Sequence, residues 1–132
     1  MKTLPLFVML LILLVSCRED AGTTTVVEGT YTGQFMRLGL TERPSPSNVT
    51  LTLEGGKFTG YSDQARYPSI CNGSYQINGG KIKFINECFW TADFDWSYIL
   101  GGEYDITIRD RKIDLIQEIN GESNFYQLEL QR

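Results

Sequence analysis

The sequence predicts an all-β domain whose eight antiparallel strands close into an up-and-down barrel. Residues 29–132 form a series of short segments in which apolar and polar side chains alternate, and turn residues separate the segments. No stretch keeps a helical period over a window of about 11 residues. The apolar side chains share one parity, which suits a sheet closed around a single core. A two-layer β-sandwich of the same strands is the alternative.

The amino terminus predicts a secreted protein with a lipid anchor. The chain opens "MKTLPLFVMLLILLVSC", in which Lys2 precedes an apolar run from 4 to 15. This run fits a secretory signal peptide and is too short to cross a bilayer, which needs about 20 residues. Its end, "LVSC" at 14–17, resembles the lipobox of bacterial lipoproteins, which implies cleavage before Cys17 and acyl chains such as palmitate on that cysteine. An ordinary signal peptide with a chance cysteine is the alternative.

The chain is therefore expected to have three parts. Residues 1–16 form the lipoprotein signal peptide, 17–28 the lipidated cysteine and a polar tether, and 29–132 the barrel domain. The acidic pair Glu19 and Asp20 behind the cysteine resembles the surface-export signal of Bacteroidota lipoproteins. The expected location is the cell outer membrane, where the protein is lipid-anchored on the periplasmic or surface-exposed face.

Composition limits the classes of partner. Removing residues 1–16 leaves 11 basic and 16 acidic residues, a net charge of −5. An acidic chain with no basic run is not expected to bind nucleic acid. There is no histidine, and the cysteines are assigned to an anchor and a disulfide, so no metal site and no cofactor is expected. The expected partners are the membrane, through the N-terminal acyl chains, and a small apolar ligand or an envelope protein. The chain itself is expected to be a monomer.

Turn residues determine where the strands begin and how they pair. We expect strands at 29–38, 48–54, 57–62, 71–78, 81–88, 100–109, 112–119 and 123–131. Two-residue turns between them pair Leu53 with Phe58, Ile108 with Ile113 and Leu115 with Tyr126. In these registers one face of the sheet carries the large apolar side chains: Tyr31, Phe35, Val49, Leu51, Leu53, Phe58, Tyr75, Ile77, Ile82, Phe84, Tyr104, Ile106, Ile108, Ile113, Leu115, Tyr126, Leu128 and Leu130. Side chains of this number and size favour a filled interior.

The hairpin that contains Cys71 and Cys88 has two possible turns. A turn at 78–79 sets the cysteines out of register, whereas a turn at 79–80 places them opposite each other. In the second register their Cα atoms come within about 4.5 Å, which is inside disulfide range. We therefore favour the second register and expect a disulfide between Cys71 and Cys88 in an oxidising compartment.

Short turns and long connections segregate to opposite ends of the expected barrel. The tight turns at 55–56, 79–80 and 110–111 fall at one end, together with the start of the first strand. The long connections 39–47, 63–70 and 89–99 fall at the other end, with the short turn at 120–121. The tether therefore leaves from the end with the short turns, and the loop end is expected to point away from the membrane.

At the loop end the inward positions of the strands become polar. Arg37, Ser62, Asn86, Gln117 and Asn124 occupy these positions. They form either a polar collar around a ligand mouth or strand ends that simply meet water, and the second interpretation is slightly favoured.

Aromatic side chains gather in the segment "ECFWTADFDWSYILGG", at residues 87–102. Trp90, Phe94 and Trp96 form either a platform that faces a ligand or a cork that fills the end of the barrel. Because aromatic side chains carry a large apolar surface, the cork is the favoured interpretation.

Asp93 and Asp95 lie among these aromatics. A carboxylate whose pKa is raised by apolar burial can act as a general acid, and paired acids hydrolyse glycosides. Side chains two residues apart seldom face one another, however. We therefore favour a structural role in which these aspartates cap a short turn through backbone N–H groups.

The chain resembles small lipocalin-like lipoproteins of Bacteroidota over most of residues 14–132. The likeness depends on the lipobox, on "GTYTG" at the first strand, on "KIKF" followed by "FWTADFDWSYILGGEY", and on the closing "FYQLEL". The resemblance implies a calycin-type barrel and an envelope location, and none of its later motifs is catalytic.

We therefore expect a lipid-anchored envelope lipoprotein that is not an enzyme. The first expected function is binding of a small apolar or amphipathic molecule at the loop end, through Arg37, Gln117, Asn124 and the segment 89–96. The alternative is a filled barrel that acts as a structural or protein-interaction module. A hydrolase that uses Asp93 or Asp95 is a distant third hypothesis.

Overall fold

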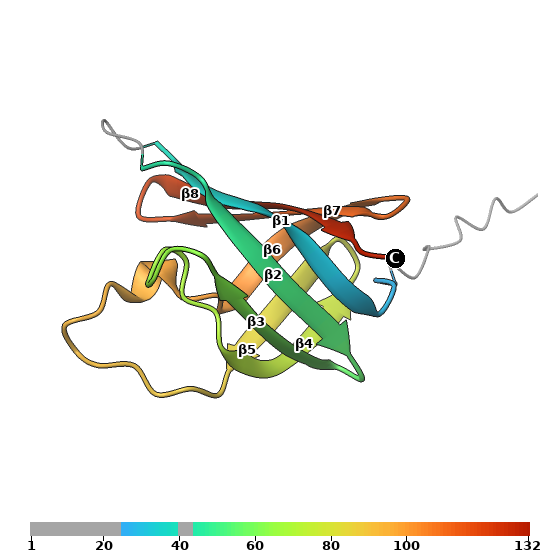
Figure 1. Cartoon of the computed structure of the whole chain (residues 1–132), viewed down its shortest axis with the longest axis horizontal. Coiled ribbons are helices and arrows are strands. Elements are labelled where there is room, and N and C mark those ends of the chain that lie inside the picture. The colour runs from blue at the N-terminus through green and yellow to red at the C-terminus, as the bar shows by residue number, and fades with distance from the viewer. Residues whose placement is uncertain (1–24, 40–43) are drawn as a thin grey trace, which may run out of the picture.

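The computed structural model describes residues 25–39 and 44–132, and these form a closed eight-stranded barrel (Figure 1). Its strands are β1 (Gly29–Leu38), β2 (Ser47–Glu54), β3 (Lys57–Ser62), β4 (Asn72–Asn78), β5 (Lys81–Asn86), β6 (Gly102–Arg109), β7 (Lys112–Ile119) and β8 (Glu122–Leu130). Each strand pairs antiparallel with the next, and β1 pairs with β8 to close the sheet. The predicted up-and-down barrel is confirmed, and closure excludes the two-layer sandwich.

Most predictions for the amino terminus lie outside the described residues. They concern the signal peptide at 1–16, the lipidated Cys17 and the tether up to residue 24. The last tether residues are described and contact the barrel, where the Tyr31 hydroxyl donates to the Val27 carbonyl at 2.6 Å. In the described part of the chain, no helix is long and apolar enough to cross a membrane.

The hairpin registers agree with those predicted from the turns. The three hairpins with two-residue turns pair as expected. In the β4–β5 hairpin Gly73 pairs with Asn86 and Ile77 with Ile82, so the turn lies at 79–80. Three strands, β1, β3 and β7, have the predicted bounds, and the bounds of the other five differ by one or two residues. At the loop end, for example, β5 ends at Asn86, two residues before the predicted end at 88.

The disulfide between Cys71 and Cys88 is confirmed, although both cysteines lie just beyond the paired strands. Their Cα atoms are 6.4 Å apart, farther than the pairing predicted. The Cys71 carbonyl accepts a hydrogen bond from the Gly60 amide of β3 at 2.9 Å. The Cys88 amide donates to the Asn86 side chain at 2.8 Å. The disulfide therefore ties the start of β4 to the first residues of the connection that follows β5.

Apolar side chains of the protein itself fill the barrel. Of the 18 residues on the predicted apolar parity, 14 are buried, and the other four pack against them half-buried: Tyr75, Ile77, Ile108 and Leu130. Aromatic rings meet edge to face inside, as Phe58 and Phe84 do with ring centroids 5.2 Å apart. Interior packing of this kind follows from placing so many large side chains on one face of a closed sheet.

Glycines on the inward face let the strands cross closely. A Cβ on Gly33 of β1 would lie 1.9 Å from the Gln127 carbonyl oxygen of β8. A Cβ on Gly73 of β4 would lie 1.9 Å from the Ile85 carbonyl oxygen of β5. At both positions the neighbouring backbone occupies the space of a side chain, so the closed barrel requires glycine there.

The two ends of the barrel differ as predicted. Figure 1 shows the connections after β1, β3 and β5 at one end, together with the β7–β8 turn, and the other short turns at the opposite end. The connections after β3 and β5 also pair with each other across the loop end. Ser69 forms a parallel bridge with Ile99, its amide donates to the Tyr98 carbonyl at 2.9 Å, and its carbonyl accepts from the Leu100 amide at 2.9 Å.

Candidate functional site

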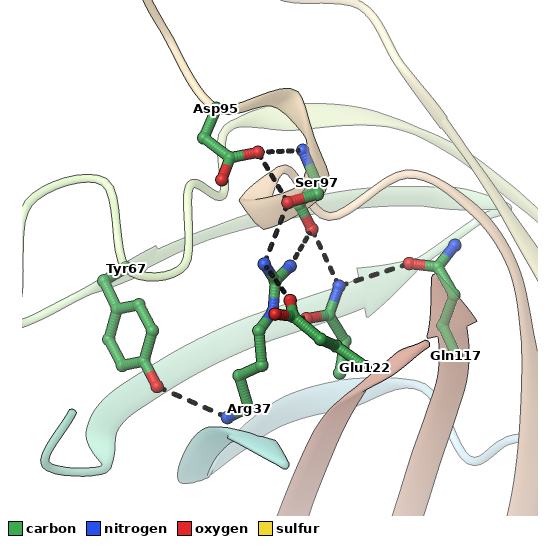
Figure 2. A network of polar contacts seen from close by, with 7 residues as sticks. Arg37, Tyr67, Asp95, Ser97, Gln117 and Glu122 are labelled. Carbon is green, nitrogen blue, oxygen red and sulfur yellow. Dashed lines mark hydrogen bonds and ion pairs between the residues drawn. The ribbon is translucent and has the colours of Figure 1, made fainter. Parts of the chain in front are cut away.

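A buried arginine joins the barrel to the connection that closes its loop end. Arg37 lies at the inward face of β1 and is only 3% exposed. Its guanidinium donates to the Asn124 side chain at 2.8 Å, to the Ser97 hydroxyl at 2.9 Å and to the Ser97 carbonyl at 2.6 Å. The Glu122 carboxylate lies 3.2 Å away and balances the charge. We call Arg37, Ser97, Glu122 and Asn124 the Arg37 network. Figure 2 shows Arg37 between Ser97 and Glu122.

Three of the five polar residues predicted at the loop end, Arg37, Gln117 and Asn124, are thus joined in one set of hydrogen bonds. The Asn124 amide donates to the Ser97 carbonyl at 2.8 Å and to the Gln117 side chain at 3.3 Å. Gln117 in turn donates to the Gly101 carbonyl at 3.0 Å. Asn124 is 1% exposed, so neither an open ligand collar nor strand ends in water describes it. Arg37 is covered in the same way, whereas Gln117 is half-buried.

Two tyrosines and a leucine from the long connections close the barrel. Tyr67, in the connection after β3, packs edge-on against Phe35 and against Tyr98, with ring centroids 5.1 Å apart in each case. The Arg37 guanidinium lies 3.7 Å from the centre of the Tyr98 ring, which is a cation–π contact. Leu100 is fully buried and belongs to the core. The cork predicted for the aromatic segment is therefore formed by Tyr98 and Leu100, with Tyr67, rather than by the tryptophans.

Two tyrosine hydroxyls lie inside the barrel beneath this closure. Tyr104 and Tyr126 are nearly fully buried, with ring centroids 5.9 Å apart. Neither hydroxyl has a hydrogen-bond partner among the described residues. Burial raises the pKa of both phenols above the ordinary value, so both are neutral at physiological pH. These groups carry no charge that could activate a substrate.

Asp95 is the N-cap of the short 3₁₀ helix η1 (Trp96–Tyr98). Its carboxylate accepts from the Ser97 amide at 3.0 Å and from the Ser97 hydroxyl at 2.5 Å. These bonds, with the Ser97 hydroxyl first, hold the pKa of Asp95 below its ordinary value. The capping role favoured from the sequence is confirmed for Asp95, and the cap presents Ser97 to Arg37 (Figure 2).

Asp93 points to solvent, with a side chain 74% exposed and its carboxylate 4.0 Å from the Arg66 guanidinium. A hydrogen bond from Thr91, followed by the residue's own amide, lowers the pKa of Asp93. A general acid in a hydrolase needs a carboxyl whose pKa is raised. The pKa of each aspartate shifts in the opposite direction, which gives the hydrolase hypothesis no support.

Replacing Asp95 by alanine is expected to lower the free energy of unfolding by about 1 kcal/mol, the usual effect of removing an N-cap. Because the folded-state pKa lies below the unfolded one, the stabilisation is fully present above the unfolded pKa, near pH 4, and is lost as pH falls through the folded pKa. Urea unfolding of both chains at pH 7 and pH 3 measures this. A difference between the two chains that grows on acidification contradicts the capping argument.

The tryptophans lie outside the core, on the flank of the loop end. Trp90 stacks on Phe94 with ring centroids 5.2 Å apart, and its indole N–H donates to the Asn86 side chain at 3.1 Å. Trp96 is 61% exposed, and its indole N–H donates to the Thr91 carbonyl at 3.2 Å. Both indole N–H groups thus have partners within the chain, and the Trp96 ring remains largely exposed.

A cleft of about 340 Å³ lies between these rings and the end of β5. We call it the aromatic cleft, and the described residues that line it are Asn86, Cys88, Phe89, Trp90, Trp96, Ile99 and Gly101. Phe89 is fully exposed, with no cover from the rest of the chain. The structure thus brings Trp90 and Trp96 to one wall and leaves the other predicted contacts elsewhere. Arg37, Gln117 and Asn124 lie in the closure, Asp95 caps η1, and Asp93 and Phe94 do not line the cleft.

Two larger hollows lie near the β6–β7 hairpin, at about 520 and 500 Å³. Their walls are exposed charged side chains of both signs, such as Arg111, Lys112 and Glu129. Small-molecule sites are mostly apolar with a few placed polar groups, and the aromatic cleft fits that description better despite its smaller volume. Among the described residues, no group of three or more metal-ligating side chains comes together.

Comparison with known protein families, with curated proteins and with solved structures finds no match to this chain. The eight-stranded antiparallel barrel is consistent with a lipocalin-like fold.

Sequence reasoning missed four residues of the closure: Tyr67, Ser97, Tyr98 and Glu122. The sequence did contain one indication of the role of Glu122. An arginine on the inward parity needs a counter-ion, and β8 carries a glutamate at the same end of the barrel. No comparable signal existed for Ser97, because its backbone carbonyl accepts two of the bonds and every residue type has one.

Proposed function

We propose that this chain is a non-enzymatic binding module of the cell envelope, anchored by Cys17, that holds a small apolar or amphipathic molecule in the aromatic cleft. The observation that carries the proposal is the cleft itself. Its volume lies within the range of roughly 300–1,000 Å³ that small-molecule pockets occupy. Four of the seven described lining residues are aromatic or aliphatic: Phe89, Trp90, Trp96 and Ile99.

The packed interior supports a site outside the barrel rather than within it. Buried side chains fill the barrel, and the Arg37 network with Tyr67 and Tyr98 closes the loop end. A ligand inside would have to displace this core and leave a buried arginine without partners, which is costly. The barrel thus serves as a rigid scaffold, and binding takes place on its flank.

The position of the cleft also fits an anchored protein. The tether enters at the start of β1, at the end opposite the long connections (Figure 1). Eleven residues of tether, 18–28, reach about 35 Å when fully extended. With acyl chains on Cys17, the aromatic cleft faces away from the membrane and is open to molecules from the surrounding compartment.

The chain contains two tryptophans, and both line the cleft, so their indole N–H signals report binding there directly. The test uses the mature chain, residues 17–132, with Cys17→Ser to prevent acylation, and titrates small apolar and amphipathic compounds by NMR. We expect binders to shift both indole signals. Trp96→Ala should weaken binding about tenfold, because exposed tryptophans often dominate binding energy.

Tyr61→Ala is the matched control, because Tyr61 is 66% exposed and does not line the cleft. This variant should bind as the parent chain does. Compounds that shift signals of the core while both indole signals stay in place would put the ligand inside the barrel and contradict the proposal. A panel in which no compound binds would favour the alternative, a filled barrel with a structural or protein-interaction role.

A further inference from the structure

The chemistry of the cleft walls narrows the class of ligand. None of the seven described lining residues is charged, so the cleft offers no counter-ion to an anion or a cation. Both indole N–H groups are already bound, Trp90 to Asn86 and Trp96 to the Thr91 carbonyl. Cys88 is in the disulfide. A ligand rich in hydroxyl groups, such as a sugar, would find few polar side-chain partners here.

Asn86 carries the one side-chain donor among these residues that is not already used. Its side-chain oxygen accepts from the Cys88 amide at 2.8 Å and from the Trp90 indole at 3.1 Å. Two donors on one atom identify that atom as the oxygen, so the orientation of the amide is settled. The amide nitrogen is buried and has no hydrogen-bond partner in the described part of the chain.

A buried donor without a partner costs free energy, and a ligand that supplies an acceptor recovers it. The Asn86 nitrogen is covered in the unliganded chain, so a ligand acceptor must displace part of the cover to reach it. Trp90 contacts the same side-chain amide through one hydrogen bond.

We propose that the aromatic cleft takes a neutral, flat, largely apolar molecule that presents one hydrogen-bond acceptor, such as a carbonyl oxygen, to the Asn86 amide nitrogen. The proposal rests on the proposed function and adds the ligand class and the residue that selects it. A cleft of about 340 Å³ equals roughly 11 water molecules at about 30 Å³ each, which limits the enclosed part of the ligand to on the order of 15 non-hydrogen atoms.

The test compares two neutral fluorescent probes that differ only in the acceptor. Prodan is a flat naphthyl ketone with a propionyl group. The comparison molecule, called the parent compound below, is its propyl analogue, in which a methylene replaces the carbonyl and the rest of the molecule is unchanged. Against the mature chain with Cys17→Ser, prodan should bind about tenfold more tightly than the parent compound, because only the ketone satisfies Asn86. Naphthoate, with the same ring system and a negative charge, should bind about tenfold more weakly than prodan.

Asn86→Asp is the decisive variant. The aspartate has the same shape and still accepts from Cys88 and Trp90, but an oxygen replaces the donor nitrogen. The tenfold preference for prodan over the parent compound should fall to about one. Asn78→Asp makes the same chemical change at an exposed position at the end with the short turns, and should keep the preference.

A second measurement is independent of any variant. The Asn86 side-chain amide signal should shift with prodan and stay in place with the parent compound. If both probes shift the indole signals with equal affinity, or if the preference survives in Asn86→Asp, the role of Asn86 is overturned while the cleft remains a binding site. If neither probe shifts the indole signals, the proposed function is overturned and this inference falls with it.

Discussion

Replacing Arg37 by alanine is expected to lower the free energy of unfolding by about 3–5 kcal/mol. The guanidinium is 3% exposed and holds three partners from two segments of the chain, β8 and the connection after β5. Its removal leaves the Ser97 carbonyl and the Asn124 side-chain oxygen buried with unmet hydrogen-bonding capacity, and leaves Glu122 without its counter-ion. The Tyr98 ring also loses the cation that it packs against.

Urea unfolding monitored by circular dichroism measures this change, with the slope of the transition compared between variants. Arg109→Ala is the control, because that arginine is 69% exposed and forms a surface ion pair with Asp114. It should change stability by less than about 1 kcal/mol. Arg37→Lys should fall between the two, since an ammonium cannot reproduce the planar fork that contacts Ser97 and Asn124.

Hydrogen exchange adds a local readout to the Arg37 prediction. In Arg37→Ala, the amides of η1 and of Leu100 should exchange faster than in the parent chain, because the loop end has lost its connection to β1. An Arg37→Ala chain that unfolds at the same urea concentration as Arg109→Ala would refute the view that this network holds the barrel end closed.

Gly33→Ala is expected to destabilise the barrel by about 3 kcal/mol or more. The added Cβ would lie 1.9 Å from the Gln127 carbonyl oxygen and 2.8 Å from the Leu128 Cα, and both atoms belong to the backbone of β8. A side chain can turn aside from such a clash, but a strand that closes a barrel can move only by breaking its hydrogen bonds. The expected destabilisation therefore comes from disrupted pairing between β1 and β8.

Gly80→Ala is the matched control for this prediction. Gly80 lies in the β4–β5 turn, and a Cβ built there meets nothing within 4 Å. Because alanine restricts the unfolded chain more than glycine does, this variant should be unchanged or more stable by up to about 1 kcal/mol. Thermal unfolding of the two variants side by side decides the matter. A Gly33→Ala chain as stable as Gly80→Ala would contradict the close approach of β1 and β8.

The glycines also show why sequence reasoning reached the fold and missed part of its geometry. Alternation of apolar residues identifies the inward face, and turn residues identify the register, because both are local properties. Gly33 and Gly73 lie on the same parity as the core residues, but their role appears only when a neighbouring strand occupies the space above them. That neighbour is defined by closure of the sheet, which involves residues far apart in the chain.

The candidate site was likewise predicted only in part from the sequence. The aromatic segment was identified as important from the sequence, and Trp90 and Trp96 do form a wall of the cleft. The sequence did not show which side chains of this segment close the barrel and which remain exposed. Tyr98 and Leu100 turn inward to close the barrel, whereas Trp96 stays 61% exposed. Which side chain turns inward depends on η1 and on the bond between its serine and Arg37, and that arginine is 60 residues away in sequence.

The sequence by itself determined the strands, the registers of their hairpins, the disulfide and the end at which the long connections gather, because alternation and turn chemistry act over a few residues. Only the tertiary structure decided that the loop end is closed rather than open. The closure depends on Arg37, Tyr67 and Tyr98 meeting from three separate segments. Such contacts are determined by packing and charge balance in the folded chain. The same packing moves the candidate binding site from the inside of the barrel to the aromatic cleft on its flank.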